Sequence, residues 1–152
     1  MEFGWINIFG AAVVVLMLLP NIVYAIRSRG EENLCASRAM NLIEQIGRYA
    51  CIVLMWLPLP VMKFGFASVA EMLLYLGGNA ALLLAYWVVF MLHMKKRRAK
   101  LALAAAVLPA CIFLMSGLLL RHWLLAAFSL VFAVGHIYVT QKNMEAAARA
   151  QR

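Results

Sequence analysis

Apolar and polar positions form long alternating blocks along this chain, and five apolar blocks are each close to the length that crosses a bilayer. A membrane-spanning helix needs about 20 mostly apolar residues. The pattern therefore predicts an all-α fold, a polytopic transmembrane helical bundle with five spans in one domain, residues 1–140. The predicted spans are 3–26, 39–64, 69–94, 101–120 and 122–140, followed by a short cytoplasmic tail, 141–152.

Polar residues inside these blocks recur three, four or seven positions apart, the spacing that places side chains on one face of a helix. The third predicted span has Tyr75, Asn79 and Tyr86 on one side, and the fifth has Ser129 and His136. The fourth carries mainly small residues along its corresponding face. Because polar groups are costly in contact with lipid, we expect these faces to turn toward one another inside the bundle.

Basic residues concentrate at every second loop and so orient the predicted bundle. Eleven of them flank the first loop, the third loop and the tail, whereas the other two loops carry only Lys63 and Arg121. Positively charged loops stay in the cytoplasm, which predicts an outside N-terminus and a cytoplasmic C-terminus in the inner cell membrane. We expect the densest basic cluster to contact anionic lipid headgroups. That cluster is Lys95, Lys96, Arg97 and Arg98.

The composition agrees with a membrane protein and argues against several other classes. The chain is 66% hydrophobic and 13% charged, whereas soluble domains carry about a quarter charged residues. Its net charge of +8 comes from residues at the ends of apolar blocks, so no nucleic-acid partner is expected. The three cysteines have no CxxC spacing, and neither a metal site nor a cofactor is expected. The first span lacks the basic region and cleavage site of a signal peptide, so we expect it to be retained.

The expected chemistry centres on two charged residues inside the second span. Glu44 and Arg48 are four positions apart with the acid first, the better order for an ion pair within one helix. Charged groups within a bilayer are costly and usually functional. Three further polar residues reach a comparable depth if each residue rises 1.5 Å along its helix. They are Asn21, Tyr86 and His136. We expect these five residues to form a ligand-binding site in the inner leaflet, and a structural ion pair that fixes helix register is the alternative for Glu44 and Arg48.

A second polar cluster is expected at the outer ends of the helices. It consists of Glu71, Arg121 and His122, with Asn7 nearby. Glu71 and Arg121 carry opposite charges at the same predicted level. A plain ion pair between them is the simplest structural explanation of both residues.

Three functions are compatible with this sequence. The first, which we favour, is binding or transport of a small polar or amphipathic solute, with Arg48 contacting an anionic group. The second is an enzyme acting on a lipid or isoprenoid, with Glu44, Arg48 and His136 as base, anion clamp and acid. The sequence argues against an enzyme, because it contains no known catalytic motif and no aspartate.

The third possibility is a structural or accessory membrane subunit, whose polar faces only hold the bundle together. For solute binding or transport, a homodimer is a further expectation, because a single chain with five helices has a narrow interior. The small-residue face of the fourth span is the expected contact surface for such a dimer.

Overall fold

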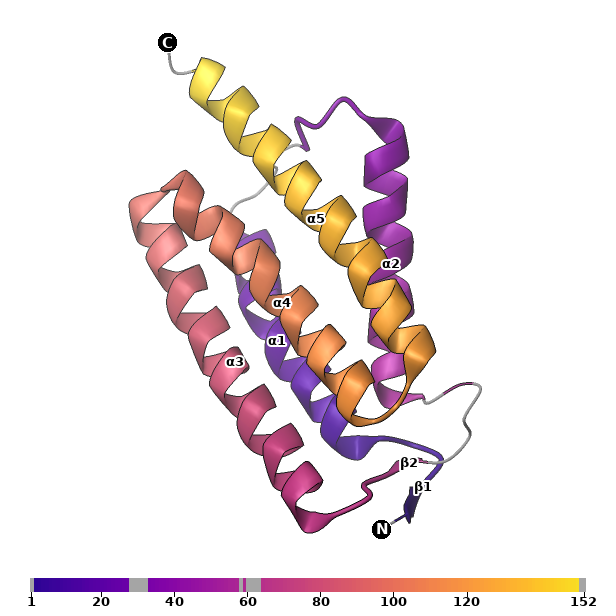
Figure 1. Cartoon of the computed structure of the whole chain (residues 1–152). Helices are drawn as coiled ribbons and strands as arrows, with labels where there is room; N and C mark the ends of the chain where they lie inside the picture. Colours follow the sequence, from indigo (N-terminus) through magenta and orange to yellow (C-terminus); the bar gives the residue numbers. More distant parts are fainter. Residues whose placement is uncertain (1, 28–32, 58, 60–63, 151–152) are drawn as a thin grey trace.

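Five helices of alternating direction make up the bundle (Figure 1), in a computed structural model that describes residues 2–27, 33–57, 59 and 64–150. The helices are α1 (Ile8–Arg27), α2 (Arg38–Trp56), α3 (Val69–Lys96), α4 (Ala99–Leu119) and α5 (Trp123–Ala150). A short antiparallel ribbon, β1 (Glu2–Gly4) with β2 (Phe64–Gly65), joins the segments before α1 and α3. We call the end of the bundle with this ribbon the hairpin end, and the opposite end, where α3 meets α4 and α5 terminates, the basic end.

Four helices are long and apolar enough to cross a membrane: α1 over Ile8–Ile26, and α3, α4 and α5 over their full lengths. These four indicate a multi-pass membrane protein. The helix α2 is not apolar enough to be among these four, because its first half is polar. That half contains Arg38, Asn41, Glu44, Gln45 and Arg48.

The first helix begins later than the apolar pattern predicts. Residues 2–4 are extended and pair with β2, and Gly4 has a positive φ of 97°. The side chain of Asn7 then caps α1, because its Oδ1 accepts the backbone N–H of Gly10 at 2.8 Å. An asparagine before the first helical residue satisfies donors that have no partner within the helix. The predicted start at residue 3 is therefore wrong.

The second helix ends earlier and the fifth ends later than predicted. Leu57 is already extended, with φ −110° and ψ 99°, because the proline that follows it disfavours helical geometry. Residues 58 and 60–63, which include Lys63 of the predicted orientation pattern, lie outside the described residues. At the other end of the chain, α5 continues through the expected tail to Ala150 without a break.

The two central helices of the bundle are α4 and α5. The fifth helix packs against both α2 and α4, α3 packs on the other side of α4, and α1 touches α3 and α2. Ala102, Ala106, Pro109 and Ala110 of α4 are buried, since small side chains let neighbouring helices approach closely. The face that we expected to form a dimer contact is thus used within the chain.

Candidate functional site

The predicted site residues Glu44, Arg48 and His136 meet on the seam between α2 and α5. Two glycines bring these helices together. A Cβ on Gly135 would lie 2.7 Å from the Cα of Glu44, and one on Gly47 would lie 2.7 Å from the Cα of Phe132. Only hydrogen fits at both positions, so the backbones touch and the side chains beside them are held in fixed register.

The Glu44 carboxylate is the centre of this group, which we call the seam cluster (Glu44, Arg48 and His136). Its Oε1 accepts a hydrogen bond from Nη2 of Arg48 one turn further along α2. The same oxygen lies 2.8 Å from Nδ1 of His136 on α5. The His136 ring is stacked on Phe132, with centroids 4.8 Å apart and planes 18° from parallel. One carboxylate oxygen thus serves two basic groups from two helices.

The three side chains of the seam cluster differ in accessibility. Glu44 is 7% exposed, His136 is 24% exposed and Arg48 is 41% exposed. The Glu44 side chain is therefore enclosed, while much of the Arg48 side chain remains open. Because guanidinium carries five N–H donors in a planar fork, Arg48 keeps donors beyond the one that contacts Glu44.

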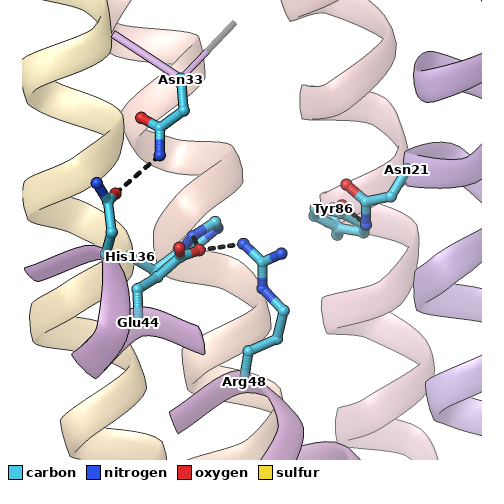
Figure 2. A network of polar contacts seen from close by, with 7 residues as sticks. Asn21, Asn33, Glu44, Arg48, Tyr86 and His136 are labelled. Carbon is cyan, nitrogen blue, oxygen red and sulfur yellow. Dashed lines mark hydrogen bonds and ion pairs between the residues drawn. The ribbon is translucent and has the colours of Figure 1, made fainter. Parts of the chain in front are cut away.

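The other two predicted site residues pair with each other. Nδ2 of Asn21 on α1 donates to the Tyr86 hydroxyl on α3 at 2.9 Å and also contacts the Met17 carbonyl. Tyr86 is buried and Asn21 is exposed. Figure 2 shows this pair on the far side of Arg48 from Glu44.

A second contact between α1 and α3 involves the proline that precedes Asn21. Pro20 has no N–H, so the Leu16 carbonyl one turn earlier loses its helical partner. The indole Nε1 of Trp87 on α3 donates to that carbonyl at 3.1 Å. This contact and the Asn21–Tyr86 hydrogen bond lie side by side, and together they fasten α1 to α3.

A group that the sequence did not identify lies deep in the hairpin half of the bundle. We call it the hairpin-end network (Asn7, Tyr75, Asn79 and Ser116). All four side chains are at most 1% exposed. Asn7 donates to the Tyr75 hydroxyl at 3.2 Å, Asn79 donates to the Tyr75 carbonyl at 2.8 Å, and Ser116 donates to Oδ1 of Asn79 at 3.2 Å.

The hairpin-end network also reaches α2, because Nδ2 of Asn7 donates to the Met55 carbonyl at 3.0 Å. It therefore connects four helices through neutral hydrogen bonds. The sequence contained part of the signal, since the helical spacing placed Tyr75 and Asn79 on one face. Their partners on other helices could not be read from spacing alone.

The expected outer cluster separates into two structural features. Nη1 of Arg121 lies 2.9 Å from Oε1 of Glu71, an ion pair whose arginine is 60% exposed. His122 instead caps α5, because its Nδ1 accepts the N–H of Leu125 at 3.0 Å. Burial lowers the pKa of His122 from its ordinary value, and backbone hydrogen bonds, including one with Leu59, act in the opposite direction. Both features belong to the turn between α4 and α5.

A groove of about 640 Å³ lies at the basic end, between the segment before α2 and the last turns of α5. Its polar lining includes Ser37, Tyr138, Lys142, Glu145 and Arg149. Lys142 contacts Glu145 at 2.8 Å, so part of its charge is already balanced. The groove is one to two helical turns from the seam cluster along the same pair of helices.

Within residues 2–27, 33–57, 59 and 64–150, no group of three or more His, Cys, Asp or Glu side chains is placed to hold a metal ion. Comparison of the chain with protein-family models, curated proteins and solved structures finds no match.

Proposed function

We propose that this chain is an integral membrane protein that binds or transports a small polar or amphipathic solute at the seam cluster. The observation that supports this most strongly is the unequal exposure of one ion pair. Arg48 is 41% exposed while its carboxylate partner is 7% exposed. Because much of the Arg48 side chain is open, its guanidinium keeps donors that can bind a second partner.

In this proposal α2 crosses the membrane as a fifth span, with its polar first half facing the other helices and its apolar second half at the hairpin end. The alternating basic loops support an orientation with the basic end in the cytoplasm and the hairpin end outside the inner cell membrane. Lys95, Lys96, Arg97 and Arg98 would then lie at the level of anionic lipid headgroups. Asn21 and Tyr86 bond each other and are not part of the proposed contact with the solute.

The contact between His136 and Glu44 also supports a second candidate function, an enzyme that modifies a lipid or isoprenoid. His136 contacts Glu44 through Nδ1, which leaves Nε2 to exchange a proton with a substrate. A carboxylate that orients an imidazole in this way is a common acid–base arrangement. In that case His136→Ala would abolish turnover of a lipid substrate while leaving the fold intact.

Solute binding can be tested by ligand-induced thermal stabilisation in nanodiscs of neutral lipid. The probes are three solutes with the same alkyl chain and different headgroups: octanesulfonate, octyltrimethylammonium and octyl glucoside. We expect at least one probe to raise the unfolding temperature of the wild-type protein and to have no such effect on Arg48→Gln.

The matched control is Arg121→Gln, which removes another half-exposed arginine that is paired with a glutamate. This variant should respond to the probes as the wild-type protein does. If all three probes stabilise Arg48→Gln as much as wild type, or if none stabilises either protein, the proposed site is wrong.

A further inference from the structure

We propose that the solute at Arg48 is a monoanion and that it binds together with one proton, which is held by the Glu44–His136 pair. This inference rests on the function proposed above. It adds the charge class of the solute and names the ion that accompanies it.

The accessible charge of the seam cluster is positive. The most exposed side chain of the cluster is that of Arg48, which carries the guanidinium, whereas Glu44 is enclosed between α2 and α5. Guanidinium forms its strongest hydrogen bonds with carboxylate, sulfonate or phosphate oxygens, often in a two-pronged arrangement. An anionic group is therefore the ligand chemistry that this surface favours over a cation or a neutral headgroup.

Binding of an anion changes the charge of the cluster. With neutral His136, the charges of Glu44 and Arg48 cancel. An arriving monoanion would leave one net negative charge beside a buried carboxylate, and unpaired charge is costly in a low-dielectric interior. One proton on the cluster restores neutrality, so the anion and the proton favour each other.

His136 is in the right place to accept that proton. Its Nδ1 is 2.8 Å from the Glu44 oxygen that Arg48 also contacts. Once protonated, the imidazole donates a charged hydrogen bond to Glu44 and replaces Arg48 as its counterion. Arg48 is then free to turn all of its donors toward the solute. Histidine is the side chain whose ordinary titration range lies closest to physiological pH.

The surroundings of His136 contain few competing charges. From α2 it faces Glu44 and Arg48. The other helix packed against α5 is α4, which has no charged residue between Leu101 and Leu120 and carries only Cys111 as a titratable group there. On α5 itself the next titratable residues are Tyr138 and Lys142. The proton count at this site is therefore governed by Glu44, Arg48 and His136.

The test uses an anion whose own charge does not change with pH. Octanesulfonate binding is measured by calorimetry in nanodiscs of neutral lipid at about pH 6 and about pH 8, on either side of the ordinary histidine range. We expect binding that is about tenfold tighter at the lower pH, because binding of the proton and of the anion are reciprocally linked. Methanesulfonate, which carries the same group without the alkyl chain, distinguishes a water-borne anion from an amphipathic one.

Two variants separate the roles of the paired groups. His136→Gln should bind octanesulfonate with equal affinity at both pH values, close to the weaker wild-type value. Glu44→Gln removes the competing carboxylate, so it should bind about tenfold more tightly than wild type at the higher pH and lose the pH dependence. A purely structural ion pair predicts that Glu44→Gln destabilises the protein without any gain in affinity.

Each negative result contradicts a different part of the proposal. If wild-type protein binds neither sulfonate but is stabilised by octyltrimethylammonium or octyl glucoside in an Arg48-dependent way, the site stands and the anion inference is wrong. If Arg48→Gln binds both sulfonates as well as wild type does, the proposed site itself is wrong. If binding requires Arg48 but has the same affinity at both pH values, the site stands and the proton inference is wrong. If Glu44→Gln does not fold, the pH dependence of wild type and its loss in His136→Gln still decide the question.

Discussion

The hairpin-end network and the seam cluster are both polar groups inside an apolar bundle, yet they differ in charge and in access. The hairpin-end network is neutral, at most 1% exposed and hydrogen-bonded across four helices. The seam cluster is charged, and the exposure of its side chains rises from 7% at Glu44 to 41% at Arg48. The groups of the hairpin-end network bond to one another and to the backbone, whereas the seam cluster keeps hydrogen-bond donors of Arg48 available.

This difference indicates how a small membrane protein can separate stability from binding. A buried network whose groups are satisfied fixes helix positions and offers nothing to a ligand. A charged group that is only partly enclosed stabilises the bundle less but can exchange partners. In the proposed function, the hairpin half of the molecule would hold the helices together and the half around Arg48 would contact the solute.

The largest expected effect comes from substitution of Gly135, which lies at the close contact between α2 and α5. Gly135→Ala places a methyl group 2.7 Å from the Cα and N atoms of Glu44, and backbone cannot move aside easily. We expect a loss of about 3 kcal/mol in the free energy of unfolding, at the upper end for overpacking. Octanesulfonate binding should disappear with it, because His136 moves away from Glu44.

The control for this substitution is Gly77→Ala, since nothing lies within 4 Å of a Cβ at Gly77. In a helix, alanine is favoured over glycine by about 1 kcal/mol, so Gly77→Ala should be neutral or stabilising. Denaturant titrations in micelles measure both variants. Equal stability of the two would show that the α2–α5 contact is looser than described.

A smaller loss is expected in the hairpin-end network. Asn79→Ala removes the acceptor of Ser116 and the donor to the Tyr75 carbonyl. Such hydrogen bonds contribute about 1 kcal/mol in membrane proteins, so the free energy of unfolding should fall by that amount. Asn33→Ala, at an exposed hydrogen bond to Asn41, is the control and should change stability much less. A loss of octanesulfonate affinity in Asn79→Ala would contradict the division between the two regions.

The next effect depends on pH and concerns the cap of α5. Burial lowers the pKa of His122 in the folded protein, so the unfolded chain takes up a proton first as the pH falls. The stabilisation is complete above the unfolded pKa of about 6.5 and decreases as the pH falls from there toward the folded value. We expect a loss of about 1 kcal/mol, the usual contribution of a helix cap.

The effect of His122 can be isolated with His122→Asn, which keeps a capping acceptor that does not titrate. Thermal unfolding between about pH 8 and about pH 5 should show a shallower slope for this variant than for wild type. Identical slopes would mean that groups other than His122 account for the pH dependence of stability.

The smallest effect is expected at the exposed ion pair of the α4–α5 turn. Arg121→Ala removes the partner of Glu71, but the arginine side chain is 60% exposed. Ion pairs of this kind contribute about 0.5 kcal/mol. A change in unfolding free energy larger than that of Asn79→Ala would show that this turn, rather than the buried network, holds the hairpin end together.

Much of the fold could be predicted because helix-length apolar blocks are a strong signal. Five helices form where five were expected, and four are apolar enough to span a membrane. The helix ends were less predictable. Asn7 caps α1 through a side-chain hydrogen bond, and the β ribbon depends on pairing between residues far apart in sequence. Neither the Asn7 cap nor the strand pairing changes the hydrophobic pattern of the sequence.

The candidate site, too, could be predicted from the sequence only in part. The Glu44–Arg48 spacing implied an intrahelical pair, which the structure contains. Depth along each helix placed His136 at the right level, and the structure brings it to Glu44. Depth could not show that Asn21 bonds Tyr86 rather than joining Glu44, because that depends on which helices are neighbours. The glycine contacts that decide this are properties of pairs of helices, and one sequence gives no direct record of them.

The division between holding and binding is tested most directly by measuring Arg48→Gln and Asn79→Ala side by side, for unfolding free energy and for octanesulfonate affinity. In Arg48→Gln, octanesulfonate binding should be lost together with the guanidinium donors, and Glu44 keeps His136 as its hydrogen-bond partner. Asn79→Ala should fold less stably and bind the sulfonate with unchanged affinity. If Arg48→Gln instead destabilises the protein as much as Asn79→Ala and still binds the sulfonate, Arg48 belongs to the structural framework and the account is wrong.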